Sequence, residues 1–510
     1  MSKYLNLFHV YVIIKMVRNE VNDMAMTRRG TDKDLGFIIG TMEEFVPQDH
    51  LVRKMEEALN WDFIYPLVKP LYSLYGRPSI DPVILFKMIF INYTFGIHSM
   101  RKTCEEIKVN LAYRWFLGIR LDESVPNYST WSQNYIRRYG DSDVFDKIFE
   151  RIIEQGLKYD FIHTDTVFAD STHQKASANK RKHERKEVEL TRKKYEDELL
   201  EEINEERISH GKKKIDHLES EEYDFDEKTG EQIIVSKTKE IKASLTDPDA
   251  GNYHKGEHEE CFAYCHQTFC DSNGFILCHV TVPGNVHDSI SFFDAYEKLN
   301  NRYKVSNVVL DAGYKTAAIA KEVKDHDQIL YLPYSRPKGE RRDIFSRKDF
   351  TYDSSDDAFI CPNNETLSYS TTDKRGYRIY KSDPSKCDKC PLLSRCTASK
   401  NHQKTLTVHI WSSYLEECEQ RRHTDDWKKI YPLRKQTIER DFGDCKENHC
   451  LRYTRLRGLK KNSHQAAIIF SVHNLKKISL WRNKNKDYYD HIDEKEAKKK
   501  KASSYIASFS

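Results

Sequence analysis

The sequence predicts an α/β fold: a domain built on a mixed β-sheet, preceded by an all-helical domain and interrupted by insertions. Residues 37–155 have helical patterns throughout, whereas residues 160–336 alternate between strand-like and helix-like segments. Two polar stretches, at 179–245 and 337–425, break this alternation. At 510 residues the chain exceeds what one hydrophobic core usually serves, so several domains are expected.

Composition indicates a folded protein without identifying its partner. Hydrophobic residues make up 38% of the chain, charged residues 32% and aromatic residues 12%, which is polar yet sufficient to build cores. The formal net charge of +4 is small beside 83 Lys and Arg and 79 Asp and Glu, so the distribution of charge matters more than its total. Twelve cysteines are too sparse for a small secreted disulfide framework, which favours a reducing cytoplasm.

The start of the chain contains one apolar run, at residues 4–14. This run is too short to span a bilayer and lacks the small-residue cleavage site of an export signal. We therefore expect residues 1–36 to be a disordered extension and the protein to have no membrane partner.

Helix start and stop signals divide the first domain. Asp81 and Pro82 predict the start of one helix, Gly118 predicts the end of the next, and residues 126–130 predict a further start. Three short helices with basic side chains on the last are compatible with a helix-turn-helix module that binds DNA. Other small helical domains share this pattern.

Strand and helix signals alternate in the second domain. A β-prone run at 167–172 is followed by two strands around an Asn-Gly turn at 262–282. The next segments are predicted as helix, strand, helix and strand, at residues 291–303, 305–314, 316–326 and 329–334. This order is typical of an α/β domain with a mixed sheet, whose last part we expect at residues 426–482.

Charge dominates the first insertion and the end of the chain. In residues 181–206, opposite charges recur three and four residues apart, which predicts an exposed helix. Such a helix is either an ordinary solvated arm or an arm that clamps DNA. The Lys-rich tail at residues 483–510 is expected to be disordered.

Two aspartates fall at the ends of predicted strands. Asp170 lies in the run 167–172, and Asp311 closes the strand within 305–314 and precedes a turn. Taken singly, such residues are most often turn formers or helix caps. Two buried carboxylates on adjacent strands, however, repel each other unless a cation lies between them. With a third acid on a later helix, they predict a metal site.

Glu439 supplies the third acid. It lies seven residues before Lys446, on the same side of a predicted helix. Residues 421–486 hold eighteen Lys and Arg against six Asp and Glu, a balance that suits a polyanion. Without the two aspartates, an ordinary salt-bridged basic helix would explain this segment equally well.

Four segments carry a specific resemblance. FADSTHQKASANKRK (168–182), TVPGNVHDS (281–289), VVLDAGY (308–314) and YPLRKQTIERDFGDCK (431–446) together resemble the DDE transposases of bacterial insertion sequences. They are similar to the branch that has a Tyr-Arg-Glu-Lys signature around its catalytic Glu. The likeness extends from about Phe37 to Trp481, with the motifs in the family's order.

The resemblance implies an RNase H-like catalytic domain whose metal-binding acids are Asp170, Asp311 and Glu439. Two Mg²⁺ ions about 4 Å apart, for which Mn²⁺ can substitute, would stabilise the entering and leaving oxygens of a phosphodiester. One such centre can cut the inverted-repeat ends of an element and then join the freed 3′-OH to target DNA. The implied partner is double-stranded DNA, held by a homodimer that brings two ends together, in the cytoplasm at the nucleoid.

The resemblance also implies DNA-binding residues. The signature's Tyr, Arg and Lys correspond to Tyr431, Arg434 and Lys446. The spacing before Glu439 points to Lys435 instead of Arg434, and we keep Arg434 because the fork of a guanidinium suits phosphate better. Further DNA contacts are expected along a basic track formed by Arg452, Arg455, Arg457, Lys460 and Lys461.

Three residues of the motif at 281–289 are expected either behind the metal ligands or on DNA: Asn285, His287 and Asp288. A structural role suits His287 equally well. Two other functions stay open beside transposition. One is an RNase H-like DNA nuclease without strand transfer, and the other is a catalytically inert DNA-binding regulator whose acids are merely structural.

Four cysteines of the second insertion form a candidate zinc site: Cys361, Cys387, Cys390 and Cys396. The two-residue gap between Cys387 and Cys390 lets both thiolates bind one tetrahedral ion, although the other gaps are unusual and unliganded thiols fit equally well. Another group lies in predicted strands, where neighbours face opposite sides, and is interpreted as core: Cys261, Cys265, Cys270 and Cys278.

Overall fold

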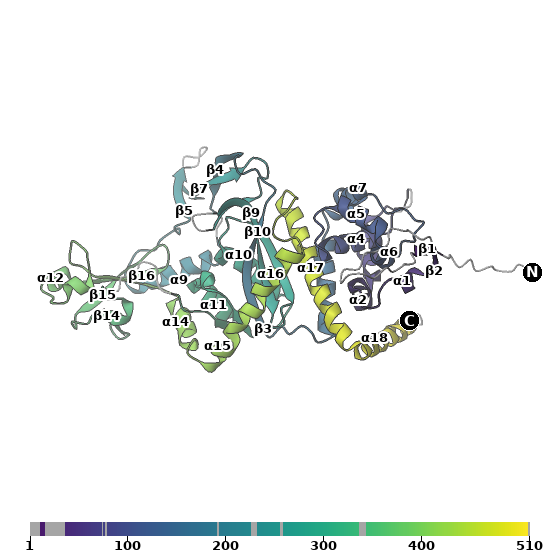
Figure 1. The fold of residues 1–510 in the computed structure, drawn as a ribbon. Helices are drawn as coiled ribbons and strands as arrows, with labels where there is room; N and C mark the ends of the chain where they lie inside the picture. The colour runs from purple at the N-terminus through teal and green to yellow at the C-terminus, as the bar shows by residue number, and fades with distance from the viewer. Residues whose placement is uncertain are drawn as a thin grey trace, which may run out of the picture. The chain divides into compact units, whose positions relative to one another are not determined.

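The computed structural model of the chain (Figure 1) describes residues 11–15, 36–73, 75–76, 79–190, 193–225, 232–255, 259–335 and 343–507. Its internal contacts divide it into two compact units. Unit 1 comprises residues 1–159, 448–450 and 468–510, and unit 2 comprises residues 160–447 and 451–467. The division therefore assigns residues 468–482, which we expected in the α/β domain, to unit 1.

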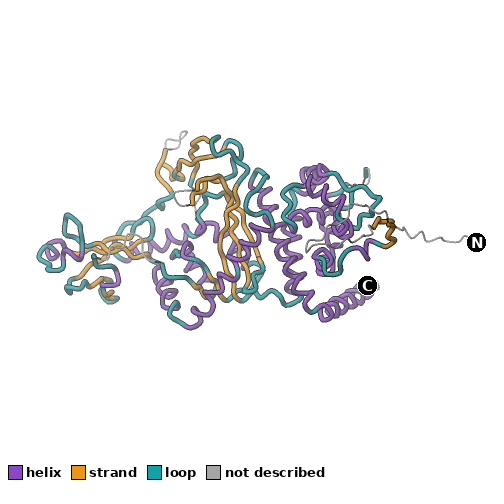
Figure 2. Tube along the Cα trace, in the orientation of Figure 1, coloured by secondary structure: helices purple, strands orange, loops and turns teal. Residues whose placement is uncertain are grey.

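Unit 1 is mainly helical up to residue 159, as predicted (Figure 2). Its helices there are α1 (Met42–Phe45), α2 (Leu51–Ala58), α3 (Ile64–Val68), α4 (Pro82–Thr94), α5 (Met100–Val109), α6 (Leu111–Leu117), α7 (Tyr128–Asn134) and α8 (Val144–Lys158). Asp81 caps α4 by accepting a hydrogen bond from the Val83 N–H at 2.7 Å, and Gly118 ends α6 at a φ of +68°. Both predicted boundaries are confirmed.

The two ends of the chain are more ordered than the sequence predicts. Most of residues 1–36 lies outside the described residues, but strand β1 (Tyr11–Lys15) pairs with β2 (Gly36–Gly40). At the other end, helix α17 (Leu459–Lys484) is followed by helix α18 (Lys486–Ala507). The expectation of disorder is thus wrong for β1, whose backbone is satisfied by pairing with β2, and for α18.

Helix α18 is held by an ion-pair cluster. Arg482, which is buried, pairs with Asp490 and with Asp493, the latter at 2.9 Å, and the Tyr159 hydroxyl donates to Asp493 at 2.8 Å. A buried guanidinium without counter-charges is costly, so the acids of the tail stabilise this arrangement. Composition could not reveal it, because the partner of those acids lies outside the tail.

Unit 2 contains the mixed sheet that the sequence predicts. Its strands are β3 (Thr166–Lys175), β8 (Gly251–Lys255), β9 (Glu259–Asp271), β10 (Ile276–Pro283), β11 (Asn307–Val309) and β12 (Ile329–Tyr331). The order is β10-β9-β3-β11-β12, with β8 also paired to β9. Strands β3, β11 and β12 run parallel to one another, and β9 runs antiparallel to its neighbours. Helices α10 (Asp288–Asn300) and α11 (Ala317–Asp325) fall where helices were expected.

The first insertion is only partly helical. Helix α9 (Glu196–Ser209) is present, but residues 183–189 form strand β4 (His183–Glu189), which pairs with β7 (Thr238–Ser244). A second hairpin joins β5 (Glu221–Phe225) to β6 (Gln232–Ser236). The prediction of one charged helix over 181–206 is therefore wrong in its first part, because residues 183–189 pair with a strand that lies further along the chain, which local charge spacing could not reveal.

The second insertion has a sheet of its own. Its strands, paired antiparallel in sequence order, are β13 (Thr351–Asp353), β14 (Ala358–Ile360), β15 (Thr366–Thr372), β16 (Tyr377–Ser382) and β17 (Thr405–His409). Two short helices, α12 (Pro384–Cys387) and α13 (Leu393–Cys396), lie between β16 and β17 in the sequence, and α14 (Ser412–Arg421) follows β17. A small core includes Phe359, Leu367 and Tyr380.

The segment with the third acid consists of short helical pieces. Helix α15 (Asp425–Ile430) leads into the 3-10 helix η6 (Tyr431–Gln436) and then into α16 (Ile438–Asn448).

Among the described residues, no helix combines the length and the apolar character needed to cross a membrane.

Candidate active site

The register of two parallel strands brings Asp170 and Asp311 together. Val309 of β11 pairs with Phe168 of β3. Asp311 lies two residues after Val309, and Asp170 lies two residues after Phe168. Residues two apart on a strand share a face, so the two carboxylates leave adjacent positions on the same side of the sheet. The sequence predicted both acids at strand ends; the parallel pairing makes them neighbours.

Asp170 is held on both of its oxygens. Its Oδ1 accepts a hydrogen bond from the Ser171 N–H at 2.8 Å, and its Oδ2 lies 2.7 Å from a terminal nitrogen of Arg434. Its side chain is 22% exposed. Burial raises the pKa of Asp170 to about 6; the guanidinium of Arg434 opposes this shift, and the carboxylates of Asp311 and Asp288 add to it. Three carboxylates, those of Asp170, Asp311 and Asp288, therefore lie close enough to affect one another.

Arg434 is buried against Asp170, whereas its sequence neighbour Lys435 is exposed to solvent. The Arg434 side chain is 7% exposed and belongs to η6, whereas Lys435 is exposed. A buried guanidinium needs a counter-charge, and Asp170 supplies it. Of the two candidates for the Arg position of the signature, the structure therefore places Arg434 against the aspartates.

The carboxylates of Glu439 and Asp311 both affect the pKa of Tyr431. Glu439 is exposed near the start of α16. Burial raises the pKa of Tyr431, and the nearby carboxylates of Asp311 and Glu439 raise it further against the effect of Arg434. Tyr431 therefore lies close to both acids. In the described chain, however, the ligand oxygens of Asp170, Asp311 and Glu439 do not all lie within 4.8 Å of one another.

The three residues of the motif at 281–289 have different positions. Asp288 lies beside the site, where its Oδ1 accepts a hydrogen bond from the Ser171 hydroxyl at 2.6 Å. His287 caps α10, because its Nδ1 accepts from the Ser289 N–H at 3.2 Å. Asn285 lies against Gly251, where a Cβ would meet its Oδ1 at 2.2 Å. His287 and Asn285 thus have local structural contacts, and Asp288 alone contacts a neighbour of Asp170.

Lys446 and the basic track lie on unit 2. Burial lowers the pKa of His266 on β9 to about 3, and His279, His173 and the nearby Lys446 lower it further. The track residues Arg452, Arg455, Arg457, Lys460 and Lys461 are all exposed. Their loop is tied to the end of β3, since Lys175 N–H donates to the Arg452 carbonyl at 3.2 Å and Thr454 N–H donates to the Lys175 carbonyl at 2.9 Å. The track is therefore anchored to the strand that carries Asp170.

Sequence reasoning missed a buried pair behind the acids. The Tyr314 hydroxyl donates to the Gln267 Oε1 at 2.7 Å, and both residues are fully buried. Burial raises the pKa of Tyr314 well above its ordinary value, and Asp170 and Asp288 contribute to the shift. Tyr314 stands in the quoted segment VVLDAGY, so its proximity to Asp311 was the only signal available. Gln267 had no such signal, because its position depends on the pairing of β9 with β3.

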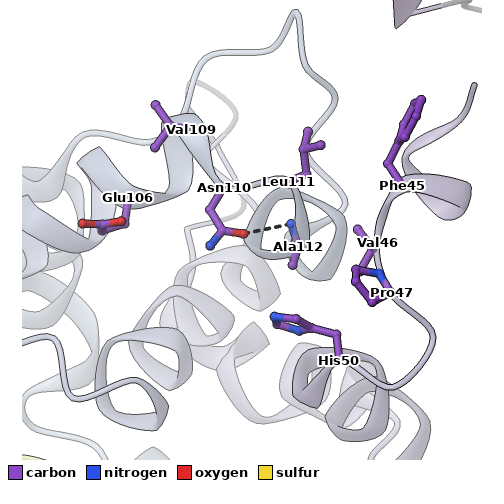
Figure 3. A pocket seen from close by; sticks show the side chains of 9 residues that line it. All are labelled: Phe45, Val46, Pro47, His50, Glu106, Val109, Asn110, Leu111 and Ala112. Carbon is purple, nitrogen blue, oxygen red and sulfur yellow. Dashed lines mark hydrogen bonds between the residues drawn. The ribbon is translucent and has the colours of Figure 1, made fainter. Parts of the chain in front are cut away.

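A separate hollow lies on unit 1 (Figure 3). It encloses about 480 Å³ and is lined by Phe45, Val46, Pro47, His50, Glu106, Val109, Asn110, Leu111 and Ala112. Two of its polar side chains are engaged locally: Asn110 Oδ1 accepts from the Ala112 N–H at 2.9 Å, and His50 Nδ1 accepts from the Val52 N–H at 3.3 Å. No sequence-predicted site residue lines it.

An aspartate on β3, a second just after the parallel strand β11, a glutamate near them and an anchored basic track define a candidate metal-dependent enzyme that acts on nucleic acid. Two family models match the chain. Residues 40–137 match a transposase domain (DUF772), and residues 360–479 match the transposase DDE domain. These matches support a DNA transposase of the DDE type, a class of divalent-metal-dependent enzymes that cleave and transfer DNA.

The family matches cover the three acids unequally. Glu439 lies within residues 360–479, whereas Asp170 and Asp311 lie outside both matched ranges. No curated protein is significantly similar in sequence. Among solved structures, a cryo-EM structure of the piggyBac transposase synaptic complex with hairpin DNA is similar over 85% of this chain and 75% of that chain, at 8% identity and a TM-score of 0.31. At this TM-score the likeness assigns no residue or chemistry to the present chain.

Proposed function

We propose that Asp170, Asp311 and Glu439 bind two Mg²⁺ ions in an RNase H-like domain, and that this centre cuts the ends of an insertion sequence and joins them to target DNA. The observation that supports it best is the parallel register that makes Asp170 and Asp311 neighbours. The strand order, with antiparallel strands on one side of β3 and parallel strands on the other, is consistent with such a domain.

The residues present suit hard divalent ions. Mg²⁺ prefers carboxylate oxygens and retains several waters, and Mn²⁺ has similar preferences. Burial and, to a smaller degree, the carboxylates of Asp311 and Asp288 raise the pKa of Asp170, and a bound cation would favour its ionised form. When bound, the ions would stabilise the charge that develops on the entering and leaving oxygens of the phosphodiester. Glu439 is exposed on a helix, so its side chain is available to complete the ligand set.

Neighbouring residues would orient the acids and the DNA. Arg434 fixes one oxygen of Asp170, and the backbone of Ser171 fixes the other. Tyr431, near Asp311 and Glu439, and Lys446, on the face of α16 that carries Glu439, would contact phosphates beside the scissile bond. The exposed basic track would extend this contact along the backbone of the duplex.

The same centre would serve both steps of transposition. Water attacks first, and the freed 3′-OH of the element then replaces water as the nucleophile toward target DNA. Because two ends must be brought together, we propose at least a homodimer, acting on the nucleoid in the cytoplasm. The Tyr-Arg-Glu-Lys branch is part of this proposal. A structural zinc in the second insertion would take no part in the chemistry.

Metal dependence tests the proposal directly. Purified protein is incubated with labelled DNA that carries the termini of its own element, with Mg²⁺, with Mn²⁺ or with EDTA. We expect cleaved and joined products with either metal and none with EDTA. Cleavage without joining would favour a nuclease, while binding without cleavage under every condition, or cutting in EDTA, would contradict the proposed chemistry.

The basic track predicts a salt-sensitive contribution to DNA binding. Arg455→Ala combined with Lys460→Ala should weaken DNA binding and lower the slope of log Kd against log salt by roughly 0.9 for each lost phosphate contact. Fluorescence anisotropy over a salt series measures this slope. Lys304→Ala is the matched control. Lys304 is exposed and precedes β11, whereas Asp311 follows β11, so the two residues lie beyond opposite ends of this strand. Equal slopes for all three proteins would exclude the track from the interface.

A further inference from the structure

The cysteines of the second insertion converge on one small cavity. Cys361 follows β14, Cys387 ends α12, Cys390 follows it, and Cys396 ends α13. All four line the same cavity of about 20 Å³, and all four are free, half-buried thiols. A cavity of this size accommodates roughly one small occupant. The fold thus brings four thiols, which are soft metal ligands, to one cavity from positions up to 35 residues apart.

Four other cysteines of unit 2 show that this convergence is not simply a consequence of burial. Cys261, Cys265 and Cys270 are spread along β9, and Cys278 lies on β10. These four are fully or nearly fully buried, as a small apolar side chain in a core usually is, and the prediction that they are core residues is confirmed. The cysteines of the insertion, by contrast, are only half buried and face a shared space.

The backbone around these thiols has the turns that metal-binding loops use. The Asn364 N–H donates to the Cys361 carbonyl at 2.8 Å, and the Glu365 N–H donates to the Cys361 Sγ at 3.3 Å. A backbone N–H directed at sulfur favours the thiolate, which is the form that binds metal. The Cys390 N–H donates to the Cys387 carbonyl at 3.0 Å, which closes a tight turn between these two thiols.

The insertion also has little core with which to stabilise itself. Its buried cluster consists of Phe350, Phe359, Leu367, Tyr380, Leu406 and Val408, and Cys361 and Cys396 pack against it. Small folded units of this kind commonly depend on a metal ion for stability. An ion bound by the four thiolates would join β14 to the two short helices that precede β17.

We propose that Cys361, Cys387, Cys390 and Cys396 bind one structural Zn²⁺ ion in tetrahedral geometry. Four sulfurs around zinc lie roughly 3.8 Å apart, given a Zn–S distance of about 2.3 Å. In the described chain no three cysteine sulfurs lie within 4.8 Å of one another, so binding draws the thiols inward from the cavity wall. Cys387, whose Sγ lies 3.1 Å from the Ser382 Oγ, exchanges this contact for the metal.

The metal content of the purified full-length protein tests the proposal. We expect about one zinc per chain by mass spectrometry, and release of that zinc as a mercurial reagent titrates about four thiols. Cys387→Ser combined with Cys390→Ser should lose the zinc, whereas Cys418→Ser, which alters a buried cysteine of α14 outside the cavity, should keep it. Because the titration uses the unaltered chain, it decides the question even if the double variant fails to fold.

Several outcomes would overturn the proposal. They are a chain without zinc after refolding in its presence, zinc retained by the double variant, iron in place of zinc, or a Cys387–Cys390 disulfide in protein purified under reducing conditions. The zinc proposal and the catalytic proposal fail separately. Asp311→Asn should keep its zinc whether or not it cuts DNA, since Asp311 lies outside the cysteine cavity.

Discussion

Asp311→Asn is expected to reduce DNA cleavage and strand transfer by roughly a thousandfold or more, because a divalent ion contributes several kcal/mol of charge stabilisation and each 1.4 kcal/mol is a factor of about ten. The substitution is conservative for the fold. The Oδ1 of Asp311 accepts a hydrogen bond from the Gly313 N–H at 2.7 Å, and an asparagine oxygen can accept the same bond. Asp311 is also only half buried. The variant should therefore fold while losing a metal ligand.

Gel assays with labelled terminal DNA measure this effect, and circular dichroism verifies the fold. Asp327→Asn is the matched control: Asp327 is exposed, and its φ of +55° is a left-handed conformation that asparagine tolerates well. We expect this control to cut and join DNA at the normal rate. Normal activity of Asp311→Asn, with an unaltered fold, would remove Asp311 from the metal site and with it the central part of the proposal.

Arg434→Met is expected to destabilise the metal-free protein by about 3–5 kcal/mol, because it leaves the carboxylate of Asp170 in a buried site without its counter-charge. Methionine retains much of the apolar stem of arginine, so the loss of stability reflects mainly the removal of the guanidinium charge. Asp170→Asn should cause a similar loss by leaving Arg434 unpaired. The double variant should lose less than the sum of the two, since it removes both members of the pair.

The loss in Arg434→Met also depends on pH, with a definite sign. Asp170 has a folded-state pKa of about 6, above its ordinary value of 3.8, so its contribution to stability falls as the pH rises from 3.8 to about 6 and is constant above that. Without Arg434 this pKa rises further. The deficit relative to the unaltered protein should therefore be small at pH 5, where the carboxyl is protonated in both proteins, and larger at pH 8.

Urea denaturation in EDTA at the two pH values measures both effects. Lys435→Met is the matched control, because Lys435 is adjacent in sequence but exposed, and surface substitutions usually change stability by less than about 0.5 kcal/mol. Strict additivity of the Arg434 and Asp170 substitutions, or a deficit that shrinks as the pH rises, would show that the ion pair does not hold Asp170.

The local features of the fold could be read from the sequence because they depend on short-range chemistry. The cap at Asp81, the left-handed Gly118 and the Asn-Gly turn before β10 each need only a few neighbouring residues. The order of β3, β9, β10, α10, β11, α11 and β12 likewise follows from periodicity. Patterns of charge were less informative: the charge-rich run at 181–206 contributes both the strand β4 and most of the helix α9.

The sequence by itself determined which residues have the chemistry: three acids in the family's order, the basic track and four cysteines with one metal-like spacing. Tertiary structure alone decided how they are combined. The register of β11 on β3 makes Asp170 and Asp311 neighbours, η6 buries Arg434 and exposes Lys435, and the second insertion gathers its thiols around one cavity. The reason is physical, since side-chain periodicity is encoded within a few residues, whereas strand pairing, burial and the gathering of the thiols depend on residues that are distant in the sequence.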